Sequence, residues 1–205
     1  MEDRPRIAIT MGDPAGVGPE IIIKMFQNQS VYDFSCPLVI GDAAFLNEVA
    51  SKLASSVSIT PISSPEKASF IPGSIDVLDL KNISATINVG QPNSLGGQVS
   101  VEYIRVAVDL ALKHKVEAIV TAPINKKSIH LAGFTWPGHT EMLADFTGTK
   151  DVALMLAGDA LRVVIVTTHV PLNQVGALVT HKQIIKTIKL THHWLLEYAT
   201  ETPKI

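Results

Sequence analysis

The sequence predicts an α/β protein with three layers, in which helices cover both faces of a mixed, mostly parallel sheet. Short apolar runs rich in Val and Ile, bounded by Gly, Pro and Asp, alternate with longer amphipathic segments along the 205 residues. Two late runs, VALMLAG and LRVVIVTT, are separated only by Asp159 and Ala160. A gap this short cannot hold a helical crossover, so these two runs are predicted to form an antiparallel hairpin within the sheet.

The predicted strands and helices follow one another in order. RIAIT (6–10) and PLVIGD (37–42) are continuous apolar runs, typical of strands covered on both faces. Between them Pro19 and Glu20 mark the start of a helix, because proline suits the first helical turn and a carboxylate favours the positive end of the helix dipole. The remaining predicted elements are helices at 43–53, 97–114 and 180–198 and strands at 56–60, 75–80 and 116–122.

Composition excludes several classes of partner. Hydrophobic residues make up 46% of the chain, enough to fill a core, and the 17 basic and 19 acidic residues are spread without a basic stripe. No apolar run is long enough to span a bilayer, and the N-terminus does not resemble a signal peptide. The single cysteine, Cys36, excludes an internal disulfide and suits a reducing compartment. We therefore expect a cytoplasmic protein that binds neither nucleic acid nor membranes.

A glycine-rich turn, ITMGDPAGVGPE (9–20), joins the first strand to the first helix. Its glycines fit neither the Walker P-loop nor the G-x-G-x-x-G dinucleotide pattern. One interpretation is purely structural, with glycines that allow positive φ and close packing. The other places Asp13 at the carboxyl edge of the sheet, where ligands of α/β proteins usually bind. The pattern alone favours the structural interpretation.

Two further stretches place a histidine beside threonines. In WPGHTEML (136–143), His139 and Thr140 precede an apolar helix and could hold an anion with the help of the helix N-terminus, or Thr140 could simply cap that helix. In VIVTTHVPL (164–172), His169 ends an apolar strand. It could be a metal ligand, but structural metal sites usually need three or four ligands, so a histidine satisfied at the sheet edge is the simpler interpretation.

Taken together, these stretches resemble the 4-hydroxythreonine-4-phosphate dehydrogenases, oxidoreductases of vitamin B6 biosynthesis. The resemblance rests, in chain order, on ITMGDPAGVGPE, PLVIGD, IVTAPINK, PGHTEML and VVIVTTHVPL. The first motif is also similar to the GDGIGPE-type turn of isopropylmalate and isocitrate dehydrogenases, which implies their two-domain architecture. We accordingly expect a first α/β domain at 1–125 and, at 126–205, the beginning of a second domain for metal and substrate binding and dimerisation. The C-terminal part of that architecture is missing from the 205 residues.

The resemblance implies oxidation of 4-phosphohydroxy-L-threonine by NAD or NADP, followed by decarboxylation to 3-amino-2-oxopropyl phosphate. It also implies a divalent metal (Zn, Mg, Mn or Co), which would lower the pKa of the substrate alcohol and stabilise the charge left by carbon dioxide. A homodimer with a shared active site is implied as well. Two alternatives stay open: a related dehydrogenase of threonate or erythronate phosphate, and a non-catalytic fragment that binds a small anion or dimerises.

Individual site residues follow from the resemblance. The family's substrate-binding His-Thr pair falls on His139 and Thr140, and the first of its three metal-binding histidines falls on His169. Lys126 and Asp13 also match family motifs but receive no role, so catalytic and cofactor-binding residues stay unassigned. The other two metal histidines and a substrate-binding lysine, asparagine and arginine belong to a later region of the family. We therefore expect the 205-residue chain by itself to be inactive.

Overall fold

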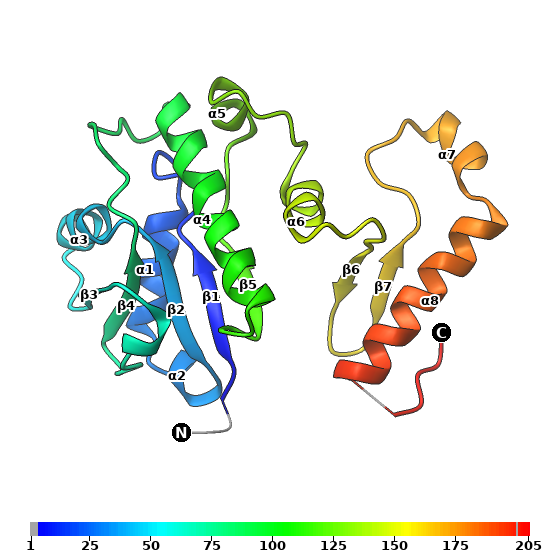
Figure 1. Cartoon of the computed structure of the whole chain (residues 1–205), viewed down its shortest axis with the longest axis horizontal. Coiled ribbons are helices and arrows are strands. Elements are labelled where there is room, and N and C mark those ends of the chain that lie inside the picture. Colours follow the sequence, from blue (N-terminus) through cyan, green and yellow to red (C-terminus); the bar gives the residue numbers. More distant parts are fainter. Residues whose placement is uncertain (1–3, 200) are drawn as a thin grey trace. The chain divides into compact units, whose positions relative to one another are not determined.

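The computed structural model describes residues 4–199 and 201–205, and the chain divides into two compact units, Met1–Thr147 and Gly148–Ile205 (Figure 1). The first unit contains β1 (Arg6–Thr10), α1 (Gly18–Gln27), α2 (Val31–Phe34), β2 (Cys36–Gly41), α3 (Ala43–Lys52), β3 (Ser58–Ile62), the short 3-10 helix η1 (Pro65–Lys67), β4 (Ser74–Asp79), α4 (Ser94–Leu112), β5 (Ala118–Thr121), α5 (Lys126–Leu131) and α6 (His139–Thr147). The second unit contains β6 (Leu154–Ala157), β7 (Arg162–Ile165), α7 (Leu172–Leu178) and α8 (His181–Tyr198).

A parallel sheet of five strands forms the centre of the first unit. Its strand order is β3-β4-β2-β1-β5, and every pairing is parallel. Ile9 of β1 lies beside Val39 of β2 on one side and Val120 of β5 on the other. The chain moves from β1 toward β2 but later crosses back to β5, so β1 and β5 flank the point where the strand order reverses. Ligands of open α/β sheets usually bind at the carboxyl ends of such a pair.

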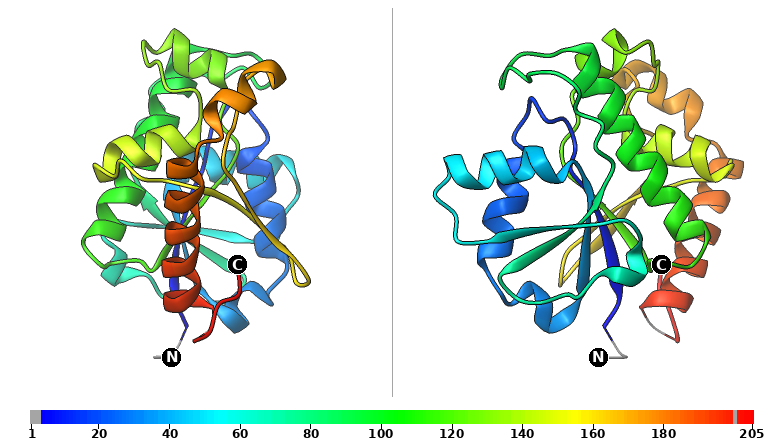
Figure 2. Two further views of the ribbon diagram at one scale, coloured as in Figure 1. Left: turned by 90° about the vertical axis from the view of Figure 1, so that its right-hand side faces the viewer. Right: turned by 60° about the vertical axis from the view of Figure 1, so that its left-hand side comes forward.

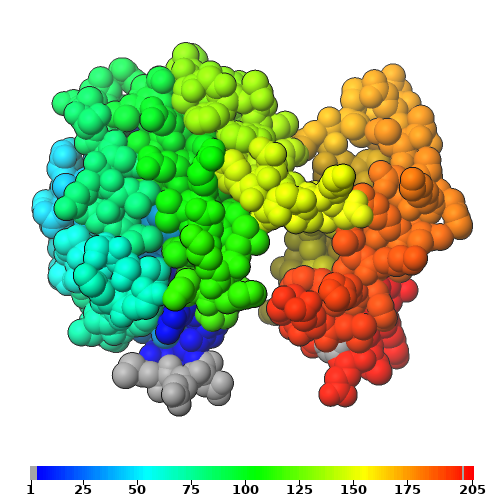
Figure 3. Space-filling model, viewed as in Figure 1, coloured from blue at the N-terminus to red at the C-terminus, as the bar shows by residue number. Residues whose placement is uncertain are grey.

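Helices cover both faces of this sheet, as predicted. α1 and α3 lie on one face and α4 on the other (Figure 2). Ile23 and Phe26 of α1, and Val99 and Tyr103 of α4, are buried in one apolar cluster with residues of the strands. Each such side chain contributes roughly 2 kcal/mol by leaving water, so these stripes are what hold the helices to the sheet. In the space-filling view the green residues of α4 lie on the near face of the first unit, and dark blue N-terminal residues are visible at its lower edge (Figure 3).

The first unit extends beyond residue 125. Ile129 of α5 and Met142 of α6 are buried in one apolar cluster with Ile104 and Val108 of α4, so both helices pack on α4. The division between the compact units accordingly lies after Thr147. The assignment of 1–125 and 126–205 to the two domains of the family architecture stays a prediction, because compactness within this chain does not test it.

The second unit contains the predicted hairpin in a different setting. β6 and β7 pair antiparallel, with Leu154 beside Ile165. They form a sheet of their own, whereas we predicted that the hairpin would join the parallel strands in one mixed sheet. Their side chains are also more exposed than an apolar run predicts, since Leu156 is 58% exposed and Val163 44%. An apolar strand is buried only where another element covers it, and within the described part of this unit Leu195 is the only buried residue.

The predicted helices, like the predicted strands, are present in the structure. The helices predicted at 43–53, 97–114 and 180–198 correspond to α3, α4 and α8, and Pro19 and Glu20 stand in the first turn of α1. The short helices α2 and α7 were not predicted, because neither is long enough to show an apolar period. Among the residues that the structure describes, no helix is both long and apolar enough to cross a membrane.

The start of α4 depends on a side-chain cap that can be tested. Asn93 Oδ1 accepts a hydrogen bond from the Gly96 backbone N–H at 2.7 Å. We expect Asn93→Ala to lower the free energy of unfolding by about 1 kcal/mol, because this N–H loses its partner. Urea unfolding followed by circular dichroism measures the change.

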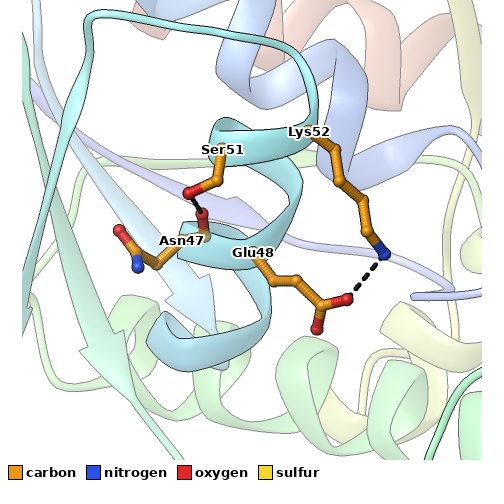
Figure 4. A network of polar contacts seen from close by, with 4 residues as sticks. All are labelled: Asn47, Glu48, Ser51 and Lys52. Carbon is orange, nitrogen blue, oxygen red and sulfur yellow. Dashed lines mark hydrogen bonds and ion pairs between the residues drawn. The ribbon is translucent and has the colours of Figure 1, made fainter.

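Asn47 provides the matched control for this cap. It lies on the exposed surface of α3. Ser51 Oγ donates a hydrogen bond to the backbone carbonyl of Asn47 at 2.9 Å, so the Asn47 side chain takes no part in this contact (Figure 4). Asn47→Ala should therefore change stability by no more than about 0.5 kcal/mol. Equal losses in the two variants would contradict the role of Asn93 as a cap.

Candidate functional site

The glycine-rich turn after β1 packs against the loop that follows β5. The Asp13 N–H donates to the Pro123 carbonyl at 3.0 Å. Gly12 has a φ of +74°, and a Cβ added there would lie 2.4 Å from the Pro123 oxygen. Only glycine can adopt this backbone conformation and allow this approach at low cost. Gly12 thus allows the segments that follow β1 and β5 to pack closely against each other, in agreement with the structural interpretation of the motif.

Asp13 lies at the carboxyl edge of the sheet, where the functional interpretation of the motif places it, but its carboxylate is buried in the protein. The side chain is 2% exposed. Its Oδ1 accepts from the Ala15 N–H at 2.8 Å, and its Oδ2 accepts from Ser128 Oγ at 2.8 Å. A buried carboxylate needs such donors, because it has lost its water. Asp13 therefore connects the turn to α5, and in this structure both carboxylate oxygens are engaged within the chain.

Ser128 is the residue of this network that sequence reasoning missed. Its hydroxyl also accepts from the Asn93 N–H at 3.3 Å, so it joins the starts of α4 and α5 to the glycine-rich turn. Lys126, by contrast, is the first residue of α5, where Asn125 caps the helix, and its side chain is exposed. A serine in a short helix gives no sequence signal of its partner, which stands 115 residues away in the chain.

His139 and Thr140 are the first two residues of α6. His139 is half-buried, and burial lowers the pKa of its imidazole. Its Nε2 is buried and has no hydrogen-bond partner among the described residues. Thr140 is exposed and already helical, so it does not precede the helix as a cap would. A neutral imidazole and a hydroxyl thus stand side by side at a helix start, an arrangement that can donate hydrogen bonds to an anion.

His169 belongs to the second unit and lies in the connection between β7 and α7. We expected it at the end of a buried strand, but β7 ends at Ile165, and His169 is exposed with a φ of +57°. Left-handed backbone is uncommon for residues other than glycine, and where it occurs it often marks a functional loop. The imidazole is accessible for coordination, but a loop rather than a strand holds it.

Metal binding needs several ligands at one place. Within the described ranges no group of three or more His, Cys, Asp or Glu residues is placed to hold a metal ion. His169 fits the chemistry of a zinc ligand but supplies a single nitrogen. His139 and Thr140 belong to the first unit and His169 to the second, so each of these residues is placed only within its own unit.

Comparison with known proteins points to one family. The family model of the pyridoxal phosphate biosynthetic protein PdxA matches residues 33–205. The chain is 39% identical over 206 residues to a 4-hydroxythreonine-4-phosphate dehydrogenase of Desulforapulum autotrophicum, covering 100% of this chain and 61% of that protein. It is also 41% identical over 202 residues to a D-threonate 4-phosphate dehydrogenase of Cupriavidus necator, covering 98% of this chain and 60% of that protein. The chain thus spans about 60% of the length of these relatives.

Solved structures agree with the sequence relatives. The crystal structure of a 4-hydroxythreonine-4-phosphate dehydrogenase from Burkholderia phymatum matches with a TM-score of 0.92 and 38% identity, over 98% of this chain and 61% of that one. A terephthalate 1,2-cis-dihydrodioldehydrogenase from Burkholderia xenovorans, at 23% identity and a TM-score of 0.63, shares the fold. The α/β class predicted from the sequence is confirmed. The chain belongs to the PdxA family of pyridoxal phosphate biosynthetic proteins.

Proposed function

We propose that this chain is part of an NAD- or NADP-dependent dehydrogenase that oxidises 4-phosphohydroxy-L-threonine and decarboxylates the product to 3-amino-2-oxopropyl phosphate. The observation that carries the proposal is the 39% identity, along the whole chain, to a relative named 4-hydroxythreonine-4-phosphate dehydrogenase. The switch point between β1 and β5 supports it, because α/β enzymes usually bind their ligands there.

His139 and Thr140 bind the substrate in this proposal. Burial favours the neutral imidazole of His139, and its unpartnered Nε2 is a buried polar atom that a bound ligand could satisfy. Thr140 exposes a hydroxyl in the same helical turn. Both residues can therefore donate hydrogen bonds to the phosphorylated substrate, with the N–H groups of the first turn of α6 beside them.

His169 is the metal ligand that this chain contributes. Its side chain is exposed in the described structure. A histidine that shares a metal ion with ligands outside this chain has to be accessible in this way. A divalent metal (Zn, Mg, Mn or Co) would supply Lewis-acid chemistry, lowering the pKa of the alcohol before hydride loss and stabilising negative charge as carbon dioxide leaves. We further propose a cytoplasmic homodimer with a shared active site, in accord with the single cysteine and with a one-ligand contribution to the metal.

D-Threonate 4-phosphate is a second candidate substrate. A D-threonate 4-phosphate dehydrogenase is 41% identical to this chain, about as similar as the 4-hydroxythreonine-4-phosphate dehydrogenases. The two substrates share a phosphate and a secondary alcohol and differ at the amino group. His139, Thr140 and His169 match the shared groups, so these residues alone do not distinguish the two substrates.

The proposal is tested with a protein that carries the chain and the further region present in the relatives. NAD(P)H formation is measured with each of the two phosphorylated substrates, with and without divalent metal. His169→Ala is expected to lower activity at least about tenfold, because a metal ligand is lost. His181→Ala, which removes another exposed histidine of the second unit, is the matched control and should leave activity unchanged.

Two results would overturn these assignments. Full activity of His169→Ala that still depends on added metal would exclude His169 as a metal ligand. Reduction of neither cofactor with either substrate would exclude both dehydrogenase functions. The 205-residue chain assayed alone is expected to produce no NAD(P)H, because its described residues do not assemble a three-ligand metal site.

A further inference from the structure

An aromatic cluster formed by Phe134, Trp136 and Phe146 holds the segment that leads into α6. The rings of Phe134 and Trp136 stack with centroids 5.2 Å apart and planes 25° apart. Trp136 meets Phe146 in an edge-on contact, also at 5.2 Å, with planes 75° apart. Phe146 lies near the end of α6, whereas Trp136 precedes its start. The segment that precedes α6 therefore runs back along this helix and packs against its last turn.

Polar contacts attach this cluster to two helices. Trp136 Nε1 donates to Asp145 Oδ2 at 3.2 Å, which ties the indole to the last turn of α6. The guanidinium carbon of Arg105 lies 4.7 Å from the centroid of the Phe146 ring, a cation–π contact that joins the cluster to α4. Beneath them Met142 of α6 is completely buried. The indole is thus fixed by stacking, by an edge contact and by a hydrogen bond.

Only Pro137 and Gly138 separate this fixed indole from His139. Proline restricts its own φ, and the Gly138 carbonyl already accepts from the Met142 N–H at 3.3 Å. Little freedom remains between the position of the Trp136 ring and the direction of the first helical turn. The Nε2 of His139 is buried without a partner in the described structure, so its usefulness for a ligand depends on where this turn holds it.

We propose that Trp136 is a positioning residue for the anion-binding pair His139 and Thr140, acting through the aromatic cluster and the Pro137-Gly138 turn. The proposal rests on the proposed function for the identity of the ligand, a phosphorylated hydroxy acid. The positioning itself is a property of this chain and can be measured without any ligand. Errors of about 1 Å in such groups can cost an enzyme two orders of magnitude in rate, which is why a rigid mount is needed.

The first test is an NMR titration of the histidine side chains in the 205-residue chain. Burial lowers the pKa of His139 in the native protein. In Trp136→Ala the first turn of α6 is released and His139 becomes more exposed, so its titration midpoint should rise toward the ordinary value for histidine. Trp136→Phe keeps a ring to stack and should leave the midpoint near the native value. The control is Trp194→Ala, which removes the second of the two tryptophans of the chain. Trp194 belongs to the second unit, and its loss should leave the titration midpoint of His139 unchanged.

An unchanged His139 midpoint in a folded Trp136→Ala protein would overturn the proposal. If that variant does not fold, Trp136→Leu retains apolar volume without a stacking ring and is subject to the same criterion. In the longer protein that carries the family's further region, Trp136→Ala should raise the KM for the phosphorylated substrate about tenfold with a smaller change in kcat, and Trp136→Phe should restore it. Absence of any dehydrogenase activity would refute the proposed function and leave the NMR result standing.

Discussion

Replacing Gly97 with alanine is expected to lower the free energy of unfolding by about 3 kcal/mol. Gly97 lies in α4 where this helix crosses α5, and an added Cβ would lie 2.0 Å from the Ser128 carbonyl oxygen and 2.3 Å from its carbonyl carbon. These are backbone atoms, so no side-chain rotation can relieve the clash. Alanine in a helix interior normally gains about 1 kcal/mol over glycine, which is too little to offset the separation of two packed helices.

Two controls distinguish this clash from a general effect of substitution. Gly176 of α7 has open space around it, and Gly176→Ala should be neutral or slightly stabilising. Gln98 is the exposed neighbour of Gly97 in α4, and Gln98→Ala should change stability by no more than about 0.5 kcal/mol. Urea unfolding followed by circular dichroism measures all three variants. A Gly97→Ala protein as stable as the Gln98→Ala protein would show that α5 can move away from α4 at little cost.

Replacing Asp13 with alanine is expected to cost about 2–4 kcal/mol of stability. The substitution removes the acceptor of the Ala15 N–H and of the Ser128 hydroxyl, both in the buried interior. A buried donor without an acceptor retains its full desolvation penalty, and the missing carboxylate also leaves a small cavity. Thermal unfolding should show a clear drop in the midpoint. Asp33→Ala, which removes an exposed carboxylate from α2, is the control and should stay close to the native midpoint.

Asp13→Asn separates the structural role of Asp13 from a direct role in catalysis. The amide keeps an oxygen for the Ala15 N–H, and its NH2 group can donate to Ser128 Oγ, so most of the stability should be retained. If Asp13 acts only through structure, the longer active protein should also keep most of its activity with this substitution. Normal stability together with lost activity would instead place the carboxylate among the groups that contact the substrate. Equal stability of Asp13→Ala and Asp33→Ala would refute the structural role.

The sequence predicted the elements whose signals are local. The apolar runs at 6–10 and 37–42 became β1 and β2, and the apolar period of 97–114 became α4, because a strand or helix depends mainly on residues close in the chain. The two-residue gap at Asp159 and Ala160 correctly predicted the β6–β7 hairpin, since so short a connection permits only antiparallel pairing. The order of the motifs also led to the correct family, although this rests on resemblance rather than on physics.

The tertiary structure decided which residues are buried and which strands pair with each other. LRVVIVTT is apolar enough for a buried strand, yet β7 is short and none of its residues is buried, because burial requires a covering element and hydropathy does not specify one. Strand pairing was also decided by the tertiary structure: the hairpin forms a separate sheet instead of extending the parallel one. The assignments of His139, Thr140 and His169 stay predictions, since the structure places the first two in one unit and the third in another.

By itself the sequence determined the α/β class, the order of the strands and helices along the chain, and the family to which the chain belongs. Only the tertiary structure decided what the glycine-rich motif does. It turned the Asp13 carboxylate inward onto Ser128, 115 residues away, and brought Gly97 against the backbone of α5. Local patterns fix secondary structure because their energies involve neighbours in the chain. The donors of a buried carboxylate can come from any part of the chain that the fold brings near it. A single sequence does not show which distant residues these are.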